Sequence, residues 1–239
     1  MNIALLGYGR MGQEIELNAP LHGHTIVLKI DGENRDDLTA TAVKDVDVAI
    51  EFTGPAAAPD MVLMALSLGL PVVSGSTGWL HRYDEIRDYC LKINGTFLHS
   101  SNFSIGVNIL FRLNSDLARI MSSLGAYKVT IEEIHHIRKL DSPSGTAVTL
   151  AEEIARQHAD YDGWKKAEEM ADPKHVPVTS LREGATPGTH SVIWESDIDR
   201  ITLRHEALNR RGFAAGALLA AEYIAGRKGV FSMSDVLSL

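Results

Sequence analysis

Short apolar runs alternate with stretches of helical spacing through the first hundred residues of the chain. A continuous apolar run is typical of a strand buried on both faces, as in a parallel sheet. Such runs predict strands over residues 3–6, 25–30, 46–52, 71–74 and 96–99, with helices over 11–17, 55–68 and 83–93 between them. Strands that alternate with helices predict an α/β domain with a doubly wound parallel sheet.

The pattern changes after Asn102. Helices are predicted over 107–124 and 144–157, and strands over 127–136, 176–181, 189–195 and 199–207. Polar turns separate the last three strands, which favours a mixed or antiparallel sheet. An Ala-rich helix over 213–225 and a short helix over 234–239 close the chain. We therefore expect one domain from residues 1–102 with 211–239, and a second α+β domain with a mixed sheet from residues 103–210.

Composition narrows the class of function. The formal net charge of -8 argues against a nucleic-acid partner and against an anionic membrane surface. No apolar run is long enough to span a membrane. The single cysteine, Cys90, allows no internal disulfide, and no signal-peptide pattern is seen, so we expect a cytoplasmic protein in which Cys90 is a small buried residue. A local basic cluster could still bind a small anionic ligand.

A glycine motif, Gly7-x-Gly9-x-x-Gly12, joins the first predicted strand to the first helix. In this context the glycines permit a tight turn, a close approach of the backbone to a pyrophosphate, and close packing of helix on strand. Asp31 ends the second strand, where an acid would bind the adenosine ribose and favour NAD over NADP. A plain tight turn and a solvated acid are the alternative interpretations. The motif predicts a Rossmann-like, dinucleotide-binding domain.

Small polar residues follow two later strands, at 75–78 and 101–104. Ligands of open α/β sheets bind outside the carboxyl ends of the strands. Small side chains there would leave room for a nicotinamide, and Phe103 could form a wall of its pocket. Each segment by itself is equally consistent with an ordinary turn.

The segment 132–147 carries the strongest signal for a substrate site. His135 could donate a proton near neutral pH, and Lys139 would add a positive charge. Ser144 is a plausible helix N-cap, which would direct the N–H groups of Gly145 and Thr146 toward an anion. Adjacent histidines on a strand point to opposite faces, so one of His135 and His136 could be structural. Zinc is disfavoured because no further ligands lie at metal spacing.

The same segment closely resembles the dihydrodipicolinate reductase family. The family signature is matched by His135-His136-x-x-Lys139-x-Asp141-Ser142-Pro143-Ser144-Gly145-Thr146-Ala147. Further family-like blocks follow in the same order over nearly the whole chain, at 7–12, 52–53, 75–78, 102–108, 182–184, 188–190, 205 and 210–216. The resemblance implies an oxidoreductase of lysine and diaminopimelate biosynthesis. It would reduce a (hydroxy-)tetrahydrodipicolinate precursor to tetrahydrodipicolinate, with hydride from NADH or NADPH going to C4 of the ring.

The resemblance also implies roles for residues. His135 would be the acid–base group that protonates the resulting enamine, and Lys139 a second proton donor or charge stabiliser. The small dicarboxylate substrate would be held by His136, Ser144, Gly145 and Thr146. The implied cofactor-binding residues are Gly7, Tyr8, Gly9, Arg10, Met11, Gly12, Asp31, Gly75, Ser76, Thr77, Ser100, Ser101, Asn102, Phe103 and Arg210. Phe213 would lie near the cofactor.

Some positions depart from the family pattern and bear on the cofactor. Gly32 follows Asp31 where many members that accept NADPH carry Arg, and Gly54 stands where some members carry a basic residue. We therefore expect NADH to serve at least as well as NADPH. The resemblance further implies a homotetramer. We expect its interface on an exposed face of the second sheet that carries Ile193, Trp194, Ile201 and Leu203.

Two other functions are left open by the residues. The first is another two-domain dehydrogenase, acting on an amino acid or a sugar, which would not explain the 132–147 segment. The second is a protein that senses NAD(H) without turnover, which would not need intact substrate residues.

Overall fold

The computed structural model describes residues 1–169, 172–209 and 211–239. Contacts divide the chain into two units. The first comprises residues 1–105 with 211–239, and the second comprises residues 106–210.

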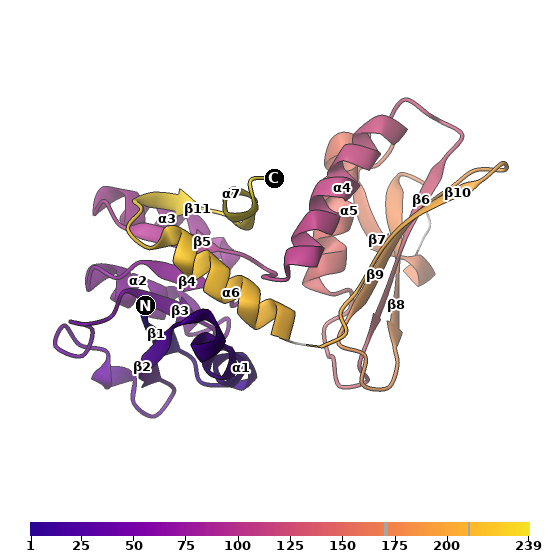
Figure 1. Cartoon of the computed structure of the whole chain (residues 1–239). Coiled ribbons are helices and arrows are strands. Elements are labelled where there is room, and N and C mark those ends of the chain that lie inside the picture. The colour runs from indigo at the N-terminus through magenta and orange to yellow at the C-terminus, as the bar shows by residue number, and fades with distance from the viewer. Residues whose placement is uncertain (170–171, 210) are drawn as a thin grey trace. The chain divides into compact units, whose positions relative to one another are not determined.

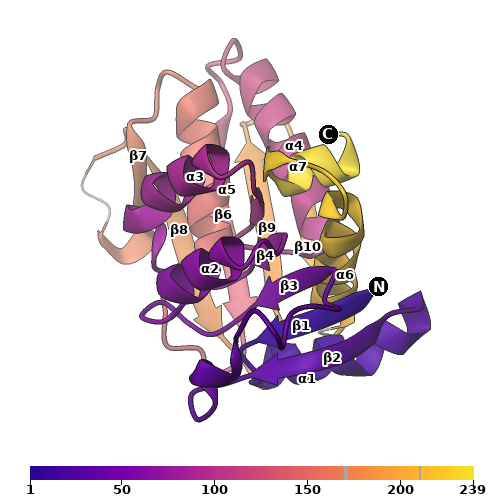
Figure 2. The same ribbon diagram turned by 90° about the vertical axis from the view of Figure 1, so that its left-hand side faces the viewer.

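The first unit is built on a six-stranded, fully parallel sheet in the order β11-β5-β4-β3-β1-β2 (Figure 2). The strands are β1 (Asn2–Leu6), β2 (Thr25–Ile30), β3 (Val48–Glu51), β4 (Val72–Ser74), β5 (Thr96–His99) and β11 (Gly229–Phe231). Alternate residues of a strand face opposite sides, so Ala4 and Leu6 join one apolar layer while Ile3 and Leu5 join the other. Burial on both faces explains why these strands read as continuous apolar runs.

Helices cover both faces of this sheet (Figure 1). The helices are α1 (Arg10–Asn18), α2 (Ala58–Ser67), α3 (Tyr83–Lys92), α6 (Arg211–Ile224) and α7 (Met233–Leu237). The α2 and α3 side chains pack on one face, where Cys90 is fully buried as expected, and α1 and α6 pack on the other. Helix α6 approaches the backbone of Phe103 closely at Gly216, where a Cβ would lie 1.8 Å from the Phe103 carbonyl oxygen. The Rossmann-like prediction is confirmed.

The second unit contains a five-stranded mixed sheet in the order β10-β9-β6-β8-β7. Its strands are β6 (Lys128–His135), β7 (Gly163–Lys166), β8 (His175–Arg182), β9 (Thr189–Glu195) and β10 (Arg200–Glu206). Strands β6, β8 and β7 run parallel, and β9 and β10 pair antiparallel. Helices α4 (Ile105–Met121) and α5 (Gly145–Gln157) cover one face, and among the described residues no α-helix covers the other (Figure 1).

One predicted surface is wrong. Trp194 is fully buried on the helix-covered side, whereas its neighbour Ile193 points to the open side. Ile201 and Leu203 pair with Trp194 and Val192, so they also lie on the covered side. The open face is mainly threonine, serine and charged residues, with Ile134, Leu181 and Ile193 among them.

Two short strands escaped the sequence analysis. Strand β7 is an edge strand of the residues Gly-Trp-Lys-Lys, and β11 has only three residues after a turn. Neither is long enough to show periodicity. Within the part of the chain that the structure describes, no helix is long and apolar enough to cross a membrane.

Candidate functional site

The first unit has a topological switch point at the carboxyl ends of β1 and β3. These strands are neighbours, yet the chain continues from β1 to β2 on one side and from β3 to β4 on the other. Connections that diverge in this way leave a crevice in which ligands of open α/β sheets bind.

The glycine motif lies at this crevice, and its three glycines have different structural roles. Gly7 has φ of +99° and donates its N–H to Ile30 O at 2.7 Å. A Cβ on Gly12 would lie 2.4 Å from Gly7 O, so glycine is needed for α1 to approach β1. A Cβ on Gly9 would meet no atom within 4 Å. Gly9 therefore borders open space at the N-terminus of α1, where free N–H groups favour an anion.

Most of the predicted cofactor residues line two cavities at the crevice. The larger, of about 490 Å³, is lined by Gly9, Arg10, Met11, Phe52, Thr53, Gly54, Pro55, Gly75, Ser76 and Thr77. The smaller, of about 100 Å³, is lined by Met11, Phe52, Gly75, Ser101, Asn102, Phe103 and Phe213. Gly75 lines both, and a Cβ there would lie 2.1 Å from the Phe52 ring. The residue types suit a dinucleotide: a helix N-terminus for phosphate and an apolar, aromatic recess for a flat ring.

Other predicted cofactor residues lie outside these two cavities. Ser100 donates its hydroxyl to Asn102 O at 2.7 Å and so shapes the turn after β5. Tyr8 bonds to Glu16 through a very short contact, and Lys29 lies 4.6 Å above the Tyr8 ring. Lys29 also pairs with Glu16 at 2.5 Å, so its charge is partly neutralised. Arg210 lies outside the described residues.

Asp31 is exposed just beyond the end of β2 and does not line either cavity. Its carboxylate accepts the Glu33 N–H at 2.8 Å, and its own N–H donates to Asn34 at 2.7 Å. These hydrogen bonds fold the polar loop of residues 31–34 around Asp31. Asp31 is adjacent to Ile30, whose carbonyl accepts the Gly7 N–H, so the acid and the glycine motif follow neighbouring strands.

A buried acid that the sequence analysis did not single out lies behind the cavity wall. Glu51, the last residue of β3, is 0% exposed. Its Oε1 accepts the Thr53 N–H at 2.6 Å, the Thr53 hydroxyl at 2.7 Å and the Ser76 hydroxyl at 2.6 Å. Its Oε2 accepts the Ser74 hydroxyl at 2.6 Å. Ser76 in turn accepts the Gly54 N–H at 2.9 Å. One carboxylate therefore connects the loops that follow β3 and β4.

In the second unit, His135 lies in a buried polar cluster at the carboxyl end of β6. Its Nδ1 is 3.4 Å from Glu133 Oε2, and the His190 Nε2 is 3.7 Å from the same oxygen. Glu133 also accepts the Ser144 N–H at 3.1 Å and contacts the Arg182 guanidinium at 3.3 Å. The Nδ1 atom is buried and makes no hydrogen bond within the described part of the chain, so the more accessible Nε2 is the nitrogen of His135 that can reach a ligand. A Cβ on residue 188 would lie 3.0 Å from that nitrogen, so Gly188 keeps the space beside it open.

Burial dominates the ionisation of this cluster. It lowers the pKa of His135 to about 4, although the nearby Glu133 carboxylate acts in the opposite direction. It also lowers the pKa of His190 to about 3. Burial disfavours the Glu133 carboxylate as well, but the hydrogen bonds from Ser144 help to lower its pKa overall. The lowered pKa favours the neutral form of His135 at neutral pH in the protein without a ligand.

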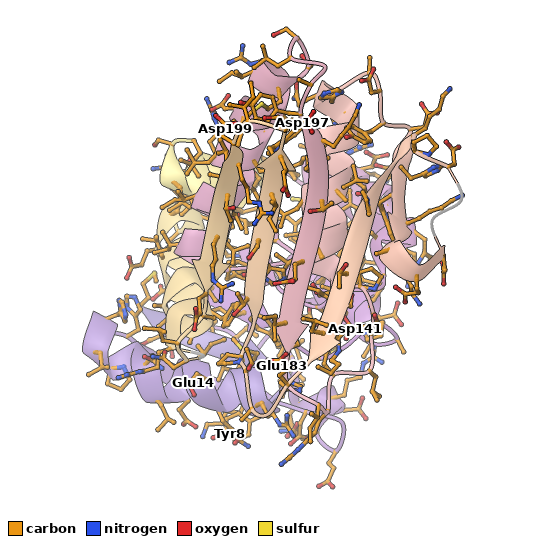
Figure 3. All side chains as sticks on the ribbon, turned by 90° about the vertical axis from the view of Figure 1, so that its right-hand side faces the viewer. Tyr8, Glu14, Asp141, Glu183, Asp197 and Asp199 are labelled. Atoms are coloured by element: carbon orange, nitrogen blue, oxygen red, sulfur yellow. The ribbon has the colours of Figure 1, made fainter. Side chains whose placement is uncertain are left out.

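The loop after β6 supplies the remaining predicted substrate residues. Lys139 pairs with Asp141 at 2.8 Å, a partner that the sequence analysis did not assign. Partial burial acts against the Asp141 carboxylate, but the hydrogen bond and the charge of Lys139, together with smaller contributions, lower its pKa overall. Figure 3 shows Asp141 and Glu183 at one end of the sheet, opposite the turn with Asp197 and Asp199. Arg182 braces this loop by donating to Asp141 O at 2.6 Å.

The start of α5 has the predicted cap. The Ser144 side chain accepts the Ala147 N–H at 3.2 Å and also bonds to His190 Nε2 at 3.1 Å. Gly145 is exposed and Thr146 half-buried at the first turn, where N–H groups and the helix dipole favour an anion. His136 is half-buried beyond the end of β6.

The ligand atoms of Glu133, His135 and His190 lie within 4.8 Å of one another, close enough to surround a metal ion. Glu133, however, is also contacted by an arginine and by a backbone N–H. These donors satisfy the carboxylate and bring positive charge beside it, which disfavours a cation.

The sequence carried one signal for the residues that were missed. Glu51 and Glu133 are acids inside apolar strands, at positions whose neighbours face the core. An acid there must have buried donors, because an unpaired buried charge is too costly. Arg182 and His190 lie in the family-like blocks 182–184 and 188–190, but those blocks did not indicate Glu133 as their partner, because it is distant in sequence.

Comparison with known proteins identifies the family. The N-terminal model of dihydrodipicolinate reductase matches residues 1–103 and the C-terminal model matches residues 106–237. A 4-hydroxy-tetrahydrodipicolinate reductase of Christiangramia forsetii is 49% identical over 100% of this chain and 98% of its own length. A protein of the same name from Bdellovibrio bacteriovorus is 36% identical over 99% of this chain and 96% of its own length.

A solved structure agrees in fold. The dipicolinate-bound dihydrodipicolinate reductase from Paenisporosarcina sp. TG-14 aligns with a TM-score of 0.78 and 22% identity, covering 97% of each chain. Two family models that together span nearly the whole sequence, and full-length relatives well above 30% identity, settle the membership. The chain belongs to the dihydrodipicolinate reductase family.

Proposed function

We propose that this protein reduces the precursor of tetrahydrodipicolinate, as its imine or its hydroxylated form, in lysine and diaminopimelate biosynthesis. NADH or NADPH supplies the hydride, which goes to C4 of the substrate ring. The observation that carries the proposal is full-length membership of the reductase family, to which a dinucleotide-shaped crevice at the switch point adds support. We expect the reaction to take place in the cytoplasm.

The crevice residues would hold the cofactor. The open space beside Gly9 and the N-terminus of α1 suit the pyrophosphate. The recess between Phe52, Phe103 and Phe213 suits the nicotinamide, because flat rings pack well against aromatic walls. Asp31 would bind the adenosine ribose and disfavour a 2′-phosphate. Arg210 keeps its predicted cofactor role only on the strength of the family resemblance.

The buried cluster and its loop would hold the dicarboxylate and supply the proton. The first turn of α5, with Ser144, Gly145 and Thr146, would accept one carboxylate, and Lys139 and His136 the other. His135 is neutral in the empty site, but a dianion beside it would raise its pKa, since an opposite charge within a few ångströms favours the charged form. Substrate binding would thus charge the group that then protonates the enamine carbon.

We propose a homotetramer that uses the open face of the second sheet. Strand register puts Leu181, Ile134 and Ile193 on that face among threonines and charged residues. In the described part of the second unit, no α-helix lies on the side of the sheet that Figure 3 shows. Light scattering at micromolar concentration should give four chain masses. A monomeric mass would contradict the assembly without affecting the proposed reaction.

The reaction itself is tested by following NADH and NADPH oxidation after addition of freshly generated dihydrodipicolinate. The proposal predicts oxidation that depends on this substrate, with NADH at least as effective as NADPH. Oxidation with an amino acid or sugar substrate instead would favour another dehydrogenase. Cofactor binding without turnover of any substrate would favour a sensor.

A further inference from the structure

The Glu51 carboxylate oxygens face four hydrogen-bond donors and no cationic partner among the residues that the structure describes. All four of its hydrogen bonds come from neutral groups, namely the Thr53 N–H and the hydroxyls of Thr53, Ser74 and Ser76. Because Ser76 accepts the Gly54 N–H, its own hydrogen is left for Glu51. No ion pair within 4.0 Å is formed by Glu51 among the residues that the structure describes. A carboxylate held only by neutral donors keeps its net negative charge.

The field of this charge extends beyond its hydrogen bonds. His99 lies at the end of β5 and bonds to Ser76 O at 3.2 Å. Burial lowers the pKa of His99, and the Glu51 charge acts in the opposite direction on that pKa. Strand β4 lies between the two residues, so this effect acts through a buried region of low dielectric constant.

Glu51 lies directly behind the cofactor crevice. Two of its partners, Thr53 and Ser76, line the larger cavity. Its backbone carbonyl accepts the N–H of Gly75 at 2.9 Å, and Gly75 lines both cavities. These small residues form the cavity wall in front of the carboxylate.

We propose that Glu51 biases the bound dinucleotide toward its oxidised form, an inference that rests on the proposed function. In hydride transfer, the C4–H bond of the dihydronicotinamide breaks and its two electrons and hydrogen form a new bond to the substrate ring. The nicotinamide ring thereby changes from neutral to a cation. A fixed negative charge behind the crevice stabilises the cation and not the neutral ring. Glu51 is thus a positioning residue for the two loops and also an electrostatic aid to hydride donation.

The test measures the dissociation constants of NAD⁺ and NADH separately, by calorimetry, on the full-length protein. Glu51→Gln preserves the shape, because its amide can donate to Ser74 while its oxygen accepts from Thr53 and Ser76. We expect the ratio of the NAD⁺ constant to the NADH constant to rise by roughly threefold to thirtyfold in this variant. Ser74→Ala is the matched control, because it removes one buried donor but retains the charge. Its ratio should remain within about twofold of wild type.

A purely structural role would weaken both forms equally and leave the ratio unchanged in Glu51→Gln, which would overturn the proposal. If that variant is poorly folded, the double variant Glu51→Met with Ser74→Ala replaces both members of one pair by apolar groups and is expected to show the same ratio. Failure of the wild-type protein to bind either dinucleotide would instead refute the proposed function. The two failures are therefore distinguishable.

Discussion

Gly9 and Gly12 lie three residues apart at the start of α1, and alanine should have different effects at the two positions. The Gly9 Cβ would enter open space in the larger cavity, and the backbone there, with φ of -80°, accepts alanine. The Gly12 Cβ would lie 2.4 Å from Gly7 O, about 1 Å closer than ordinary contact allows. Gly9→Ala should therefore impair the ligand site, and Gly12→Ala the fold.

The magnitudes follow from these contacts. Gly12→Ala forces α1 away from β1, a type of overpacking that costs about 1–3 kcal/mol, offset by up to ~1 kcal/mol of helix propensity. Gly9→Ala replaces an N-cap glycine and should cost no more than about 1 kcal/mol of stability. Its methyl group would lie where the pyrophosphate approaches. We expect NADH binding at least about tenfold weaker, equivalent to ~1.4 kcal/mol.

Urea denaturation measures the stability of each variant, and a fluorescence titration measures its NADH affinity. Gly125→Ala serves as the control, because Gly125 is an exposed glycine of the second unit whose Cβ would also meet nothing within 4 Å. It should change neither quantity. If Gly9→Ala binds NADH as tightly as wild type, no phosphate approaches Gly9 and the placement of the cofactor fails.

Three further predictions concern titrating and charged groups. His135→Ala should lower kcat about 10²–10⁴-fold in steady-state assays and leave NADH binding intact, whereas Lys139→Ala should change both kcat and KM. If His135→Ala keeps more than about a tenth of the wild-type kcat, His135 is not the acid. Burial raises the pKa of Glu153 to about 7, so its protonated form stabilises the fold below about pH 4.5, and that contribution is lost as pH rises to about 7. Glu153→Gln should therefore be about 1–3 kcal/mol more stable than wild type above about pH 7 in urea titrations, with no gain near about pH 4.5; an equal difference at both pH values would refute this. Asp31→Ala should weaken NADH binding in a titration, and unchanged affinity would show that Asp31 does not bind the ribose.

Much of the fold could be predicted because local patterns and tertiary burial agree. The predicted ranges 25–30, 96–99 and 189–195 coincide with β2, β5 and β9. In these strands turn residues bound an apolar or alternating run on both sides. Strands β7 and β11 gave no pattern, because their edge positions are defined by pairing with β8 and β5 rather than by their own side chains.

The site could be predicted only in part. The glycines and Ser144 act through their own backbone or the next turn, so their local context is sufficient to place them. The charge state of His135 depends on burial and on Glu133, Lys139 and Arg182, which the sequence alone does not bring together. The face of the second sheet was misassigned because Ile193 and Trp194 are both apolar, and only packing shows which of them joins the core.

The most direct test of the central claim is the fate of the hydride. The protein is supplied with NADH deuterated at C4 on the transferable face and with freshly generated dihydrodipicolinate, and the product is analysed by mass spectrometry. The account predicts tetrahydrodipicolinate that carries one deuterium at the ring C4, in amounts equal to the NADH consumed. Unlabelled product, or bound NADH that is never consumed, would contradict it.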